Sequence, residues 1–326
     1  MPKSVQFTTH GGPDVLSVVE TPKPEPVSGE VRIRLYAAGL NYIDTYHRTG
    51  YYPVPSLPSG IGLEGAGVID AIGPDVQGWS EGQRVAFVVT SLGTYAEYRT
   101  VPADRLVALP DEIEFEQAAG MMLKGMTARY LLRQTYPVSS EDAILVHAAA
   151  GGVGLILCQW AAYLGATVIG TVGSPEKAEL ARANGCAYPV LYREEDVVDR
   201  VREITGGDGV AVVYDSVGRD TMEQSLQCLR QRGLLVSFGQ SSGPVEGFDP
   251  VMLSRHGSLF LTRPTLFHYV ASREELEENA GELFSVVRSG NVTIPVRQRY
   301  GLDEAAEAHR ALQARETTGS TVFVIS

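Results

Sequence analysis

The sequence predicts an α/β protein in which a doubly wound parallel sheet is inserted into a β-rich domain. Residues 1–125 contain short β-type runs separated by glycines and prolines, which indicates a β-rich domain. In residues 126–264 strand and helix patterns alternate strictly, and the near-continuous apolar strands suit a parallel sheet covered on both faces. Residues 265–326 mix amphipathic helices with strands, so we expect them to return to the N-terminal domain.

The N-terminal strands are predicted from alternation. Residues 31–36 alternate apolar and polar side chains as a half-buried strand does, and residues 65–73 and 84–89 continue the pattern. Residues 21–26 contain three prolines, which exclude a helix or a central strand and predict an extended connection. Residues 116–132 predict a single helix that leads into the alternating region.

The alternating region is expected to supply six strands and the helices between them. The strands are predicted at residues 143–147, 167–171, 187–191, 210–215, 234–238 and 258–261. The intervening helices are predicted at residues 153–164, 175–184, 196–204 and 221–229. Beyond them we predict helices at residues 273–289 and 303–315, and strands at 292–300 and 321–325.

Composition and charge argue against several classes of protein. The chain has 326 residues and a formal net charge of -12, so neither a nucleic acid nor an anionic membrane is an expected partner. Three widely spaced cysteines predict neither a disulfide framework nor a cysteine zinc cluster. There is no signal-peptide pattern and no apolar run of about 18 residues, so we expect a cytoplasmic protein without a membrane span.

The stretch HAAAGGVG, residues 147–154, stands between a predicted buried strand and an apolar helix. Gly151, Gly152 and Gly154 would let the backbone approach a pyrophosphate, with Val153 in the first helical turn. The spacing departs from G-x-G-x-x-G, and a tight turn without a ligand is the alternative. Its place on the first strand of the alternating region favours dinucleotide binding.

The second predicted strand indicates which dinucleotide binds. NAD sites usually carry an acidic residue about 20 positions after the loop, whereas this strand ends in Gly173 and Ser174. Lys177 lies on the first turn of the next predicted helix, and Tyr192 and Arg193 follow the third strand. Such a cationic pocket favours the 2′-phosphate of NADPH over NADH, with a solvated Lys177 as the alternative.

Four stretches in order along the chain resemble one known family. They are AGLNYID at 38–44, PSGIGLEGAG at 58–67, HAAAGGVG at 147–154 and YDSVG at 214–218. They resemble the zinc-independent quinone oxidoreductases, the zeta-crystallin branch of the medium-chain dehydrogenase/reductase superfamily. The resemblance covers essentially the whole chain and implies a Rossmann NADPH-binding domain inserted in a GroES-like catalytic domain, as well as a homodimer.

The resemblance also bears on metal binding. Zinc alcohol dehydrogenases of the superfamily have a cysteine where this chain has Asn41 and a histidine where it has Leu63. Glu64 remains, but one carboxylate does not make a zinc site, so we expect a structural residue there and no metal. Without a Lewis acid the acceptor must itself be electrophilic, as a quinone or an enone is, and water can supply the proton.

The resemblance implies that the segment from Asn41 to Tyr52 lines the cleft beside the nicotinamide. The expected catalytic residues there are Asn41, Tyr46 and Tyr52, because they offer hydrogen-bond donors and flat faces to a quinone. Packing of these tyrosines in a loop is the alternative. The resemblance implies cofactor contacts by Asn41, Tyr42, Ile43, Asp44, Thr45, Tyr46, Thr127, Tyr130, Thr265, Leu266 and Arg315. Strand ends and the glycine loop add Gly151, Gly152, Val153, Gly173, Ser174, Lys177, Tyr192, Val217, Gly239, Gln240, Ser241 and Ser242.

Three residues are expected to lie outside the chemistry: Arg48 at the surface or in a salt bridge, His147 as a satisfied core histidine, and Cys158 in the core. The whole pattern predicts NADPH-dependent, metal-free reduction of a small-molecule quinone between the two domains, by hydride or single-electron transfer. The alternatives are a 2-alkenal or enone reductase and a non-catalytic NADPH-binding structural or sensor protein. The apolar residues 258–262 at the sheet edge could pair with a second copy.

Overall fold

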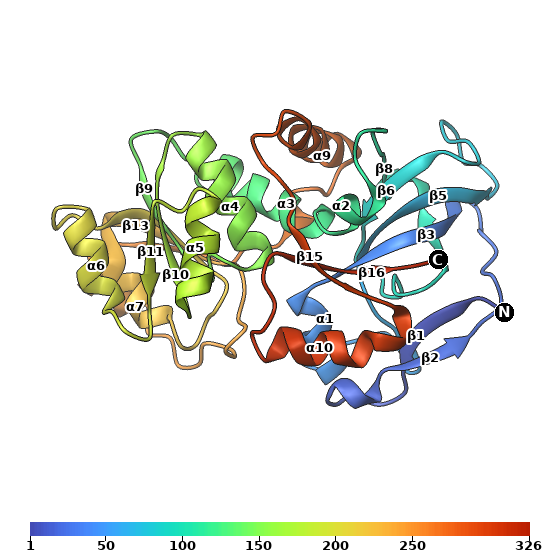
Figure 1. Cartoon of the computed structure of the whole chain (residues 1–326), viewed down its shortest axis with the longest axis horizontal. Helices are drawn as coiled ribbons and strands as arrows, with labels where there is room; N and C mark the ends of the chain where they lie inside the picture. The colour runs from blue at the N-terminus through green and yellow to red at the C-terminus, as the bar shows by residue number, and fades with distance from the viewer. The chain divides into compact units, whose positions relative to one another are not determined.

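The computed structural model describes residues 1–326, and the chain forms two compact units. Unit 1 contains residues 1–126, 270–288 and 294–326, and unit 2 contains residues 127–269 and 289–293. Unit 1 holds mainly antiparallel sheets, whereas unit 2 holds a parallel sheet (Figure 1). The predicted fold class, a doubly wound sheet within a β-rich frame, is confirmed. None of the helices combines the length and the apolar character that a membrane span requires.

The sheet of unit 2 consists of parallel strands in the order β11-β10-β9-β12-β13-β14. Counted along the chain this order is 3-2-1-4-5-6, which reverses between β9 and β12 and defines a doubly wound fold. The strands are β9 (Ala143–Val146), β10 (Thr167–Val172), β11 (Tyr188–Leu191), β12 (Val210–Asp215), β13 (Leu229–Ser237) and β14 (Phe260–Thr262). Each overlaps the range predicted for it.

Five helices follow the strands of unit 2; the alternating pattern predicts the first four, and the short fifth helix between β13 and β14 was not predicted. They are α4 (Gly152–Tyr163), α5 (Pro175–Ala183), α6 (Val197–Ile204), α7 (Met222–Cys228) and α8 (Val251–Arg255). Helix α4 packs on β9 and β10, α5 on β10 and β11, and α7 on β12 and β13. Cys158 on α4 is buried, as expected for a core residue.

Unit 1 contains a three-stranded sheet, β2-β1-β4, and a seven-stranded sheet, β15-β16-β3-β5-β6-β8 with β7 beside β3. The strands are β1 (Lys3–Phe7), β2 (Ser17–Glu20), β3 (Glu30–Leu40), β4 (Ser59–Gly60), β5 (Glu64–Ile72), β6 (Arg84–Val88), β7 (Tyr98–Pro102), β8 (Leu106–Ala108), β15 (Val296–Tyr300) and β16 (Ser320–Val324). On β3 the alternating Val31, Ile33 and Leu35 enter the core. The C-terminal strand β16 pairs with β3 and completes the larger sheet.

The helices that begin in unit 1 are α1 (Tyr42–Thr49), α2 (Phe115–Ala119), α3 (Met122–Tyr130), α9 (Arg273–Arg288) and α10 (Ala305–Gln313). The single helix predicted at 116–132 is wrong, because the chain breaks at Gly120 between α2 and α3, and α3 ends in a π-helical turn, Leu131–Thr135. The carbonyl of Gly120 accepts a hydrogen bond from Ser320 Oγ at 2.7 Å. A Cβ on Gly120 would lie 3.1 Å from the Ser320 side chain, so the close approach of β16 explains the break.

Candidate functional site

The carboxyl ends of the parallel strands in unit 2 carry the residues predicted from the strand pattern, together with Thr265 and Leu266, which the resemblance implied. Because neighbouring strands run in the same direction, all of these ends lie along one edge of the sheet. This edge carries Gly151, Gly152 and Val153 after β9, Gly173, Ser174 and Lys177 after β10, Tyr192 after β11, Val217 after β12, Gly239, Gln240, Ser241 and Ser242 after β13, and Thr265 and Leu266 after β14. The structure therefore brings these predicted residues to one edge.

The glycine turn forms a short connection between β9 and α4. Ala148 adopts the left-handed region with φ 53°, and its carbonyl accepts the Gly151 N–H at 2.8 Å. A Cβ on Gly154 would lie 2.3 Å from the Ala148 carbonyl oxygen, so only glycine fits there. Helix α4 begins after Gly151, which offers no side-chain cap. The amides of the first turn therefore suit an anionic ligand, such as a pyrophosphate.

The end of β10 forms a second small cradle. A Cβ on Gly173 would lie 2.8 Å from the Tyr192 hydroxyl oxygen, so the tyrosine rests against the glycine. The Arg193 guanidinium lies 6.0 Å from the centroid of the Tyr192 ring. Ser174 caps α5, and its Oγ accepts the Lys177 backbone N–H at 3.4 Å. Glu176 shares this exposed turn, and a hydrogen bond with Ser174 lowers its pKa.

The loops after β12 and β13 are bonded to each other. Ser242 Oγ donates to the Val217 carbonyl at 2.7 Å, and the Ser242 N–H donates to the same carbonyl at 2.9 Å. A Cβ on Gly239 would lie 2.6 Å from the Ser216 carbonyl oxygen, which shows how closely the two loops approach. The switch between β9 and β12 is thus flanked by a tightly bonded pair of loops.

The predicted contacts on α3 are buried. Tyr130 is 1% exposed, and burial raises the pKa of its phenol. Its ring stacks on Tyr269 with centroids 4.3 Å apart and planes 12° apart. Thr127, also buried, lies one turn earlier on α3. These side chains pack within unit 2 rather than projecting into solvent.

His147 at the end of β9 is a satisfied core histidine, as expected. It is 2% exposed, and both ring nitrogens lie 3.0 Å from a hydroxyl oxygen, Nδ1 from Thr171 and Nε2 from Ser225. Burial lowers the pKa of its imidazole, which favours the neutral form. Ser225 Oγ in turn lies 2.8 Å from Asp215 Oδ2, so a buried polar chain runs under the glycine turn.

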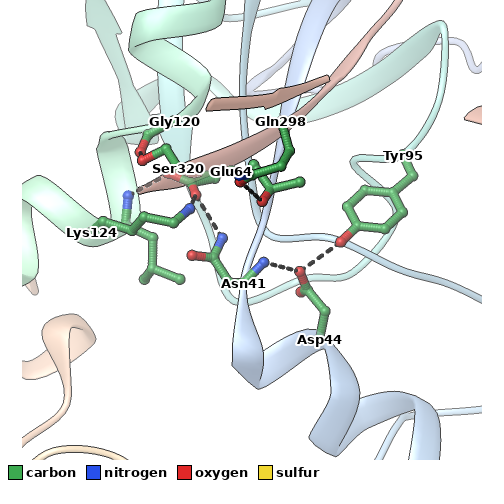
Figure 2. Close-up of polar contacts among 10 residues, drawn as sticks. Asn41, Asp44, Glu64, Tyr95, Gly120, Lys124, Gln298 and Ser320 are labelled. Carbon is green, nitrogen blue, oxygen red and sulfur yellow. Dashed lines mark hydrogen bonds and ion pairs between the residues drawn. The ribbon is translucent and has the colours of Figure 1, made fainter. Parts of the chain in front are cut away.

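In unit 1 the candidate residues surround the start of α1. Asn41 follows β3 and is 6% exposed. Its side-chain Nδ2 donates to Glu64 Oε1 at 2.6 Å, and its backbone N–H donates to Asp44 Oδ2 at 2.8 Å (Figure 2). The amide of Asn41 is therefore fixed in orientation by a buried carboxylate.

Glu64 lies at the start of β5 and is fully buried. Besides Asn41, its carboxylate accepts the Leu123 N–H at 2.6 Å and pairs with Lys124 Nζ at 3.0 Å (Figure 2). Zinc requires three or four N, S or O ligands in a tetrahedral array. No group of three His, Cys, Asp or Glu residues in the chain could hold a metal ion, and Glu64 already receives an ammonium and two N–H donors. These residues do not fit a zinc ion.

Asp44 on the first turn of α1 is another fully buried carboxyl. Its Oδ2 accepts Tyr95 Oη at 2.7 Å as well as the Asn41 N–H, while its Oδ1 has no partner. Burial raises its pKa to about 7, and the hydrogen bonds from Tyr95 and Asn41 only partly oppose this effect. Asp44 therefore takes up a proton near neutral pH.

The predicted tyrosines form a cluster around Tyr46. The centroid of its ring lies 5.5 Å from the ring centroid of Tyr42, 5.7 Å from that of Tyr51 and 5.1 Å from that of Tyr52. All three contacts are edge-on, which is a favourable geometry for aromatic rings. The remaining predicted positions Ile43 and Thr45 also lie on α1, where Thr45 Oγ1 donates to the Tyr42 carbonyl.

The expectation for Arg48 is wrong. It is fully buried and makes no salt bridge; instead its guanidinium bonds Gly11 O, His309 Nδ1 and Gln313 Oε1 at 3.1, 2.9 and 2.8 Å. These bonds anchor α1 to α10. Arg315 follows α10, and its charge partly offsets the burial that raises the pKa of Tyr42. The fold thus brings Arg315, remote in sequence, near the start of α1.

Sequence reasoning did not single out Lys124, Asp215 or Ser225. A lysine inside the apolar run MMLKGM was the one available signal, since a buried lysine needs a partner. Asp215 ends a predicted buried strand, but nothing in the sequence connects it to Ser225 or His147.

Comparisons with known proteins agree with this architecture. The chain matches the alcohol dehydrogenase GroES-like domain over residues 27–111 and the zinc-binding dehydrogenase family over residues 152–285. A quinone oxidoreductase of Pseudomonas aeruginosa is 53% identical over 99% of this chain and 100% of its own length. The crystal structure of Escherichia coli quinone oxidoreductase complexed with NADPH is 49% identical, covers 99% of both chains and gives a TM-score of 0.97. A 2-haloacrylate reductase of a Burkholderia species is 45% identical over 96% of both chains.

Proposed function

Because the chain belongs to the quinone oxidoreductases of the medium-chain dehydrogenase/reductase superfamily, we propose that it catalyses NADPH-dependent reduction of a quinone. The observation that carries this proposal is the full-length similarity to quinone oxidoreductases, together with a strand edge suited to a dinucleotide. When bound, NADPH supplies a hydride, transferred directly or as separate electrons and a proton. The residues of this chain bind, orient and shield the reactants.

Unit 2 is proposed to hold NADPH along its strand edge. The uncapped first turn of α4 and the close backbone at Gly154 suit the pyrophosphate. Tyr192 rests against Gly173, the Arg193 guanidinium lies beside the Tyr192 ring, and Lys177 lies on the first turn of α5; these residues would favour the 2′-phosphate. The resemblance adds Thr127, Tyr130, Thr265 and Leu266 from unit 2, and residues 41–46 and Arg315 from unit 1.

Unit 1 is proposed to orient the acceptor through Asn41, Tyr46 and Tyr52. Glu64 holds one Nδ2 hydrogen of Asn41, which leaves the other amide groups of this side chain to face a ligand. The aromatic cluster around Tyr46 offers flat faces for a quinone ring. Since the donor set around Glu64 does not fit zinc, the acceptor must accept a hydride unaided, and a quinone does so because its anion is delocalised. Water can supply the final proton.

A second candidate function is the reduction of conjugated carbonyl compounds such as 2-alkenals. The 45% identical relative named 2-haloacrylate reductase favours this candidate, because a haloacrylate is an electrophilic alkene. Enones and quinones place comparable demands on the residues described, so the tyrosine cluster does not separate them. A non-catalytic NADPH-binding role is the third alternative.

The test is oxidation of NADPH by purified, chelator-treated protein with 1,4-benzoquinone, an ortho-quinone and a short 2-alkenal, with NADH in parallel. Turnover of a quinone with NADPH supports the proposal, whereas turnover of the alkenal alone supports the second candidate. Tight binding of NADPH without turnover would leave the non-catalytic role. The variant Lys177→Glu should weaken NADPH far more than NADH; equal losses would remove the 2′-phosphate argument.

We also propose a homodimer that forms through β14. This strand is at the edge of the parallel sheet, and Phe260 on it is 61% exposed. An apolar edge strand exposed to water is a liability that pairing with a second copy would remove. Light scattering should show a dimer for the native chain and a monomer for Phe260→Glu. A native monomer would exclude this assembly.

A further inference from the structure

A continuous chain of hydrogen bonds lies beneath the glycine turn of unit 2. Asp215 Oδ2 lies 2.8 Å from Ser225 Oγ, which lies 3.0 Å from His147 Nε2. On the other side of the imidazole, Nδ1 lies 3.0 Å from Thr171 Oγ1. Thr171 Oγ1 then accepts the Ala148 backbone N–H at 3.4 Å. These hydrogen bonds join β12, α7, the residue directly after β9, and β10, and all four side chains are buried.

The carboxylate of Asp215 sets the direction of every bond in this chain. Its Oδ1 accepts the N–H groups of Val217 and Gly218, and its Oδ2 accepts the hydroxyls of Ser225 and Thr221. Because four donors point at it, the carboxyl acts only as an acceptor. The Ser225 hydroxyl therefore donates its only hydrogen to Asp215, so the Ser225 oxygen must accept a hydrogen bond from His147.

This direction fixes the tautomer of His147. A neutral imidazole has one N–H and one bare nitrogen. The N–H must be on Nε2, which donates to Ser225, so the bare Nδ1 must accept the hydroxyl hydrogen of Thr171. The oxygen of Thr171 is then left to accept the Ala148 N–H. Hydrogen bonds aligned in this way polarise and strengthen one another.

Both ends of this hydrogen-bond chain contact segments that are proposed to bind the cofactor. At one end Asp215 holds the amides of Val217 and Gly218 at 2.8 and 3.0 Å. At the other end Thr171 holds Ala148, which adopts the costly left-handed region with φ 53°. The Ala148 carbonyl in turn shapes the glycine turn through its bond with Gly151.

We propose that Asp215, Ser225, His147 and Thr171 form a positioning chain that holds the glycine turn and the loop after β12 in the geometry that binds NADPH. This chain of hydrogen bonds does not touch the reacting atoms. It holds the two loops in the binding conformation before NADPH arrives, so that NADPH does not have to reorganise them. The inference rests on the proposed NADPH binding. NADPH binding and quinone turnover are therefore measured first on the native protein, which tests the proposed function. The variants are then compared with these native values.

The first experiment compares two Thr→Val variants on the same strand. Thr171→Val keeps the shape and the β-propensity but removes the hydroxyl that links His147 to Ala148, whereas Thr167 at the exposed start of β10 provides the matched control. Fluorescence titration should show the Kd for NADPH raised about fivefold to tenfold in Thr171→Val and unchanged in Thr167→Val. The kcat at saturating NADPH and the KM for the quinone should stay within about twofold of the native values, because the chain acts only on cofactor binding.

The second experiment reads the direction of the chain itself. In ¹⁵N-histidine-labelled protein, long-range NMR correlations should show His147 protonated on Nε2, with its signals identified by their loss in His147→Gln. The isosteric Asp215→Asn would place an amide NH₂ toward Ser225, which forces Ser225 to donate to His147. His147 should then become protonated on Nδ1, and the Kd for NADPH should rise as in Thr171→Val. A merely structural contact would not invert a tautomer.

Three results would overturn the proposal. One is a native His147 protonated on Nδ1, because the direction derived from Asp215 would then be wrong. Another is an unchanged Kd for NADPH in both Thr171→Val and Asp215→Asn, because the chain would then not govern the turn. The third is a lower kcat with an unchanged Kd, since the residues would then act at another step. If Thr171→Val does not fold, Asp215→Asn alone decides between these outcomes.

Discussion

Glu64 in unit 1 and Asp215 in unit 2 are both fully buried carboxylates, but the protein stabilises them differently. Glu64 receives an ammonium from Lys124 and two N–H groups, from Asn41 and Leu123. Asp215 has no cation within ion-pair distance and is held by two hydroxyls and two backbone amides. One anion is neutralised by a formal charge, and the other is solvated by dipoles.

This difference predicts how much a substitution at each carboxylate lowers the free energy of unfolding. Removing the cation from Glu64 would leave a buried charge with two N–H donors and no opposite charge, which is strongly destabilising. Removing one dipole from Asp215 leaves three others in place. Asp44 completes the comparison, because it has only two donors and no bonded cation, and its pKa rises to about 7.

The largest effect is expected for Lys124→Met, which removes the ammonium but keeps most of the volume. The free energy of unfolding, measured by urea denaturation, should fall by about 3–5 kcal/mol. The control Lys23→Met breaks a partly exposed pair with Asp70, which keeps its bond to Arg32, and should cost less than about 1 kcal/mol. The double variant Lys124→Met with Glu64→Gln should recover part of the loss. A Lys124→Met protein as stable as the control would show that Glu64 does not depend on its cation.

Asp44→Asn should change how stability depends on pH. Because the folded pKa of about 7 lies above the model value of 3.8, the folded state binds a proton that the unfolded chain releases. This contribution to stability is complete below about pH 4 and is lost as the pH rises to about 7. The free energy of unfolding of Asp44→Asn relative to the native chain should therefore increase across that window by on the order of 4 kcal/mol.

Parallel pH curves for the native chain and Asp44→Asn would contradict the assignment of a proton to Asp44. Asparagine at this position can still accept from Tyr95 and from the Asn41 N–H, so the variant removes the titration and keeps both hydrogen bonds. Urea denaturation at pH 4, 5.5, 7 and 8 provides the measurement.

Ser225→Ala should lower the free energy of unfolding less than Lys124→Met does, because three donors to Asp215 remain. The change removes one of four donors to Asp215 and one acceptor for His147, at a cost of about 1–3 kcal/mol in unfolding free energy. Ser254→Ala is the matched control, because the Ser254 hydroxyl donates to the Val251 carbonyl on the exposed face of the short helix α8. If Ser225→Ala cost more than Lys124→Met, dipoles rather than the ion pair would hold the more critical charge.

The smallest effect on stability is expected for Tyr52→Phe, which lies outside both buried networks. The ring contacts with Tyr46 remain, so the unfolding free energy should change by less than about 0.5 kcal/mol. Quinone turnover should change while NADPH affinity stays constant, because the hydroxyl is proposed to face the acceptor. Tyr188→Phe on β11 is the exposed control. An unchanged turnover would assign Tyr52 to packing alone.

The sequence predicted the fold well because strands and helices leave periodic signals. The six strand ranges of unit 2 were recovered since near-continuous apolar runs alternate with amphipathic ones. The helix at 116–132 was mispredicted because the approach of Ser320 to Gly120 is a tertiary contact 200 positions apart in sequence. The strand edge and its candidate residues followed from topology.

The polar networks could not be predicted, for a related reason. Arg48 looked like a surface cation, since its partners His309 and Gln313 are contributed by α10, far along the chain. Likewise, Asp215 meets Ser225 and His147 only after the strands are stacked side by side. Periodicity shows which residues are buried, but it does not show which buried polar groups satisfy one another.

The bond between Arg48 and His309 has a consequence for synthesis on the ribosome. Unit 2 is almost one continuous stretch, so it can collapse as soon as residue 269 has emerged. Helix α1 emerges much earlier, yet two of the three partners of the Arg48 guanidinium, His309 and Gln313, are contributed by α10, and His309 is translated 261 positions later. Until then β3 also lacks β16 as a neighbour, so the N-terminal part of the chain cannot complete its larger sheet before the C-terminal strand is translated.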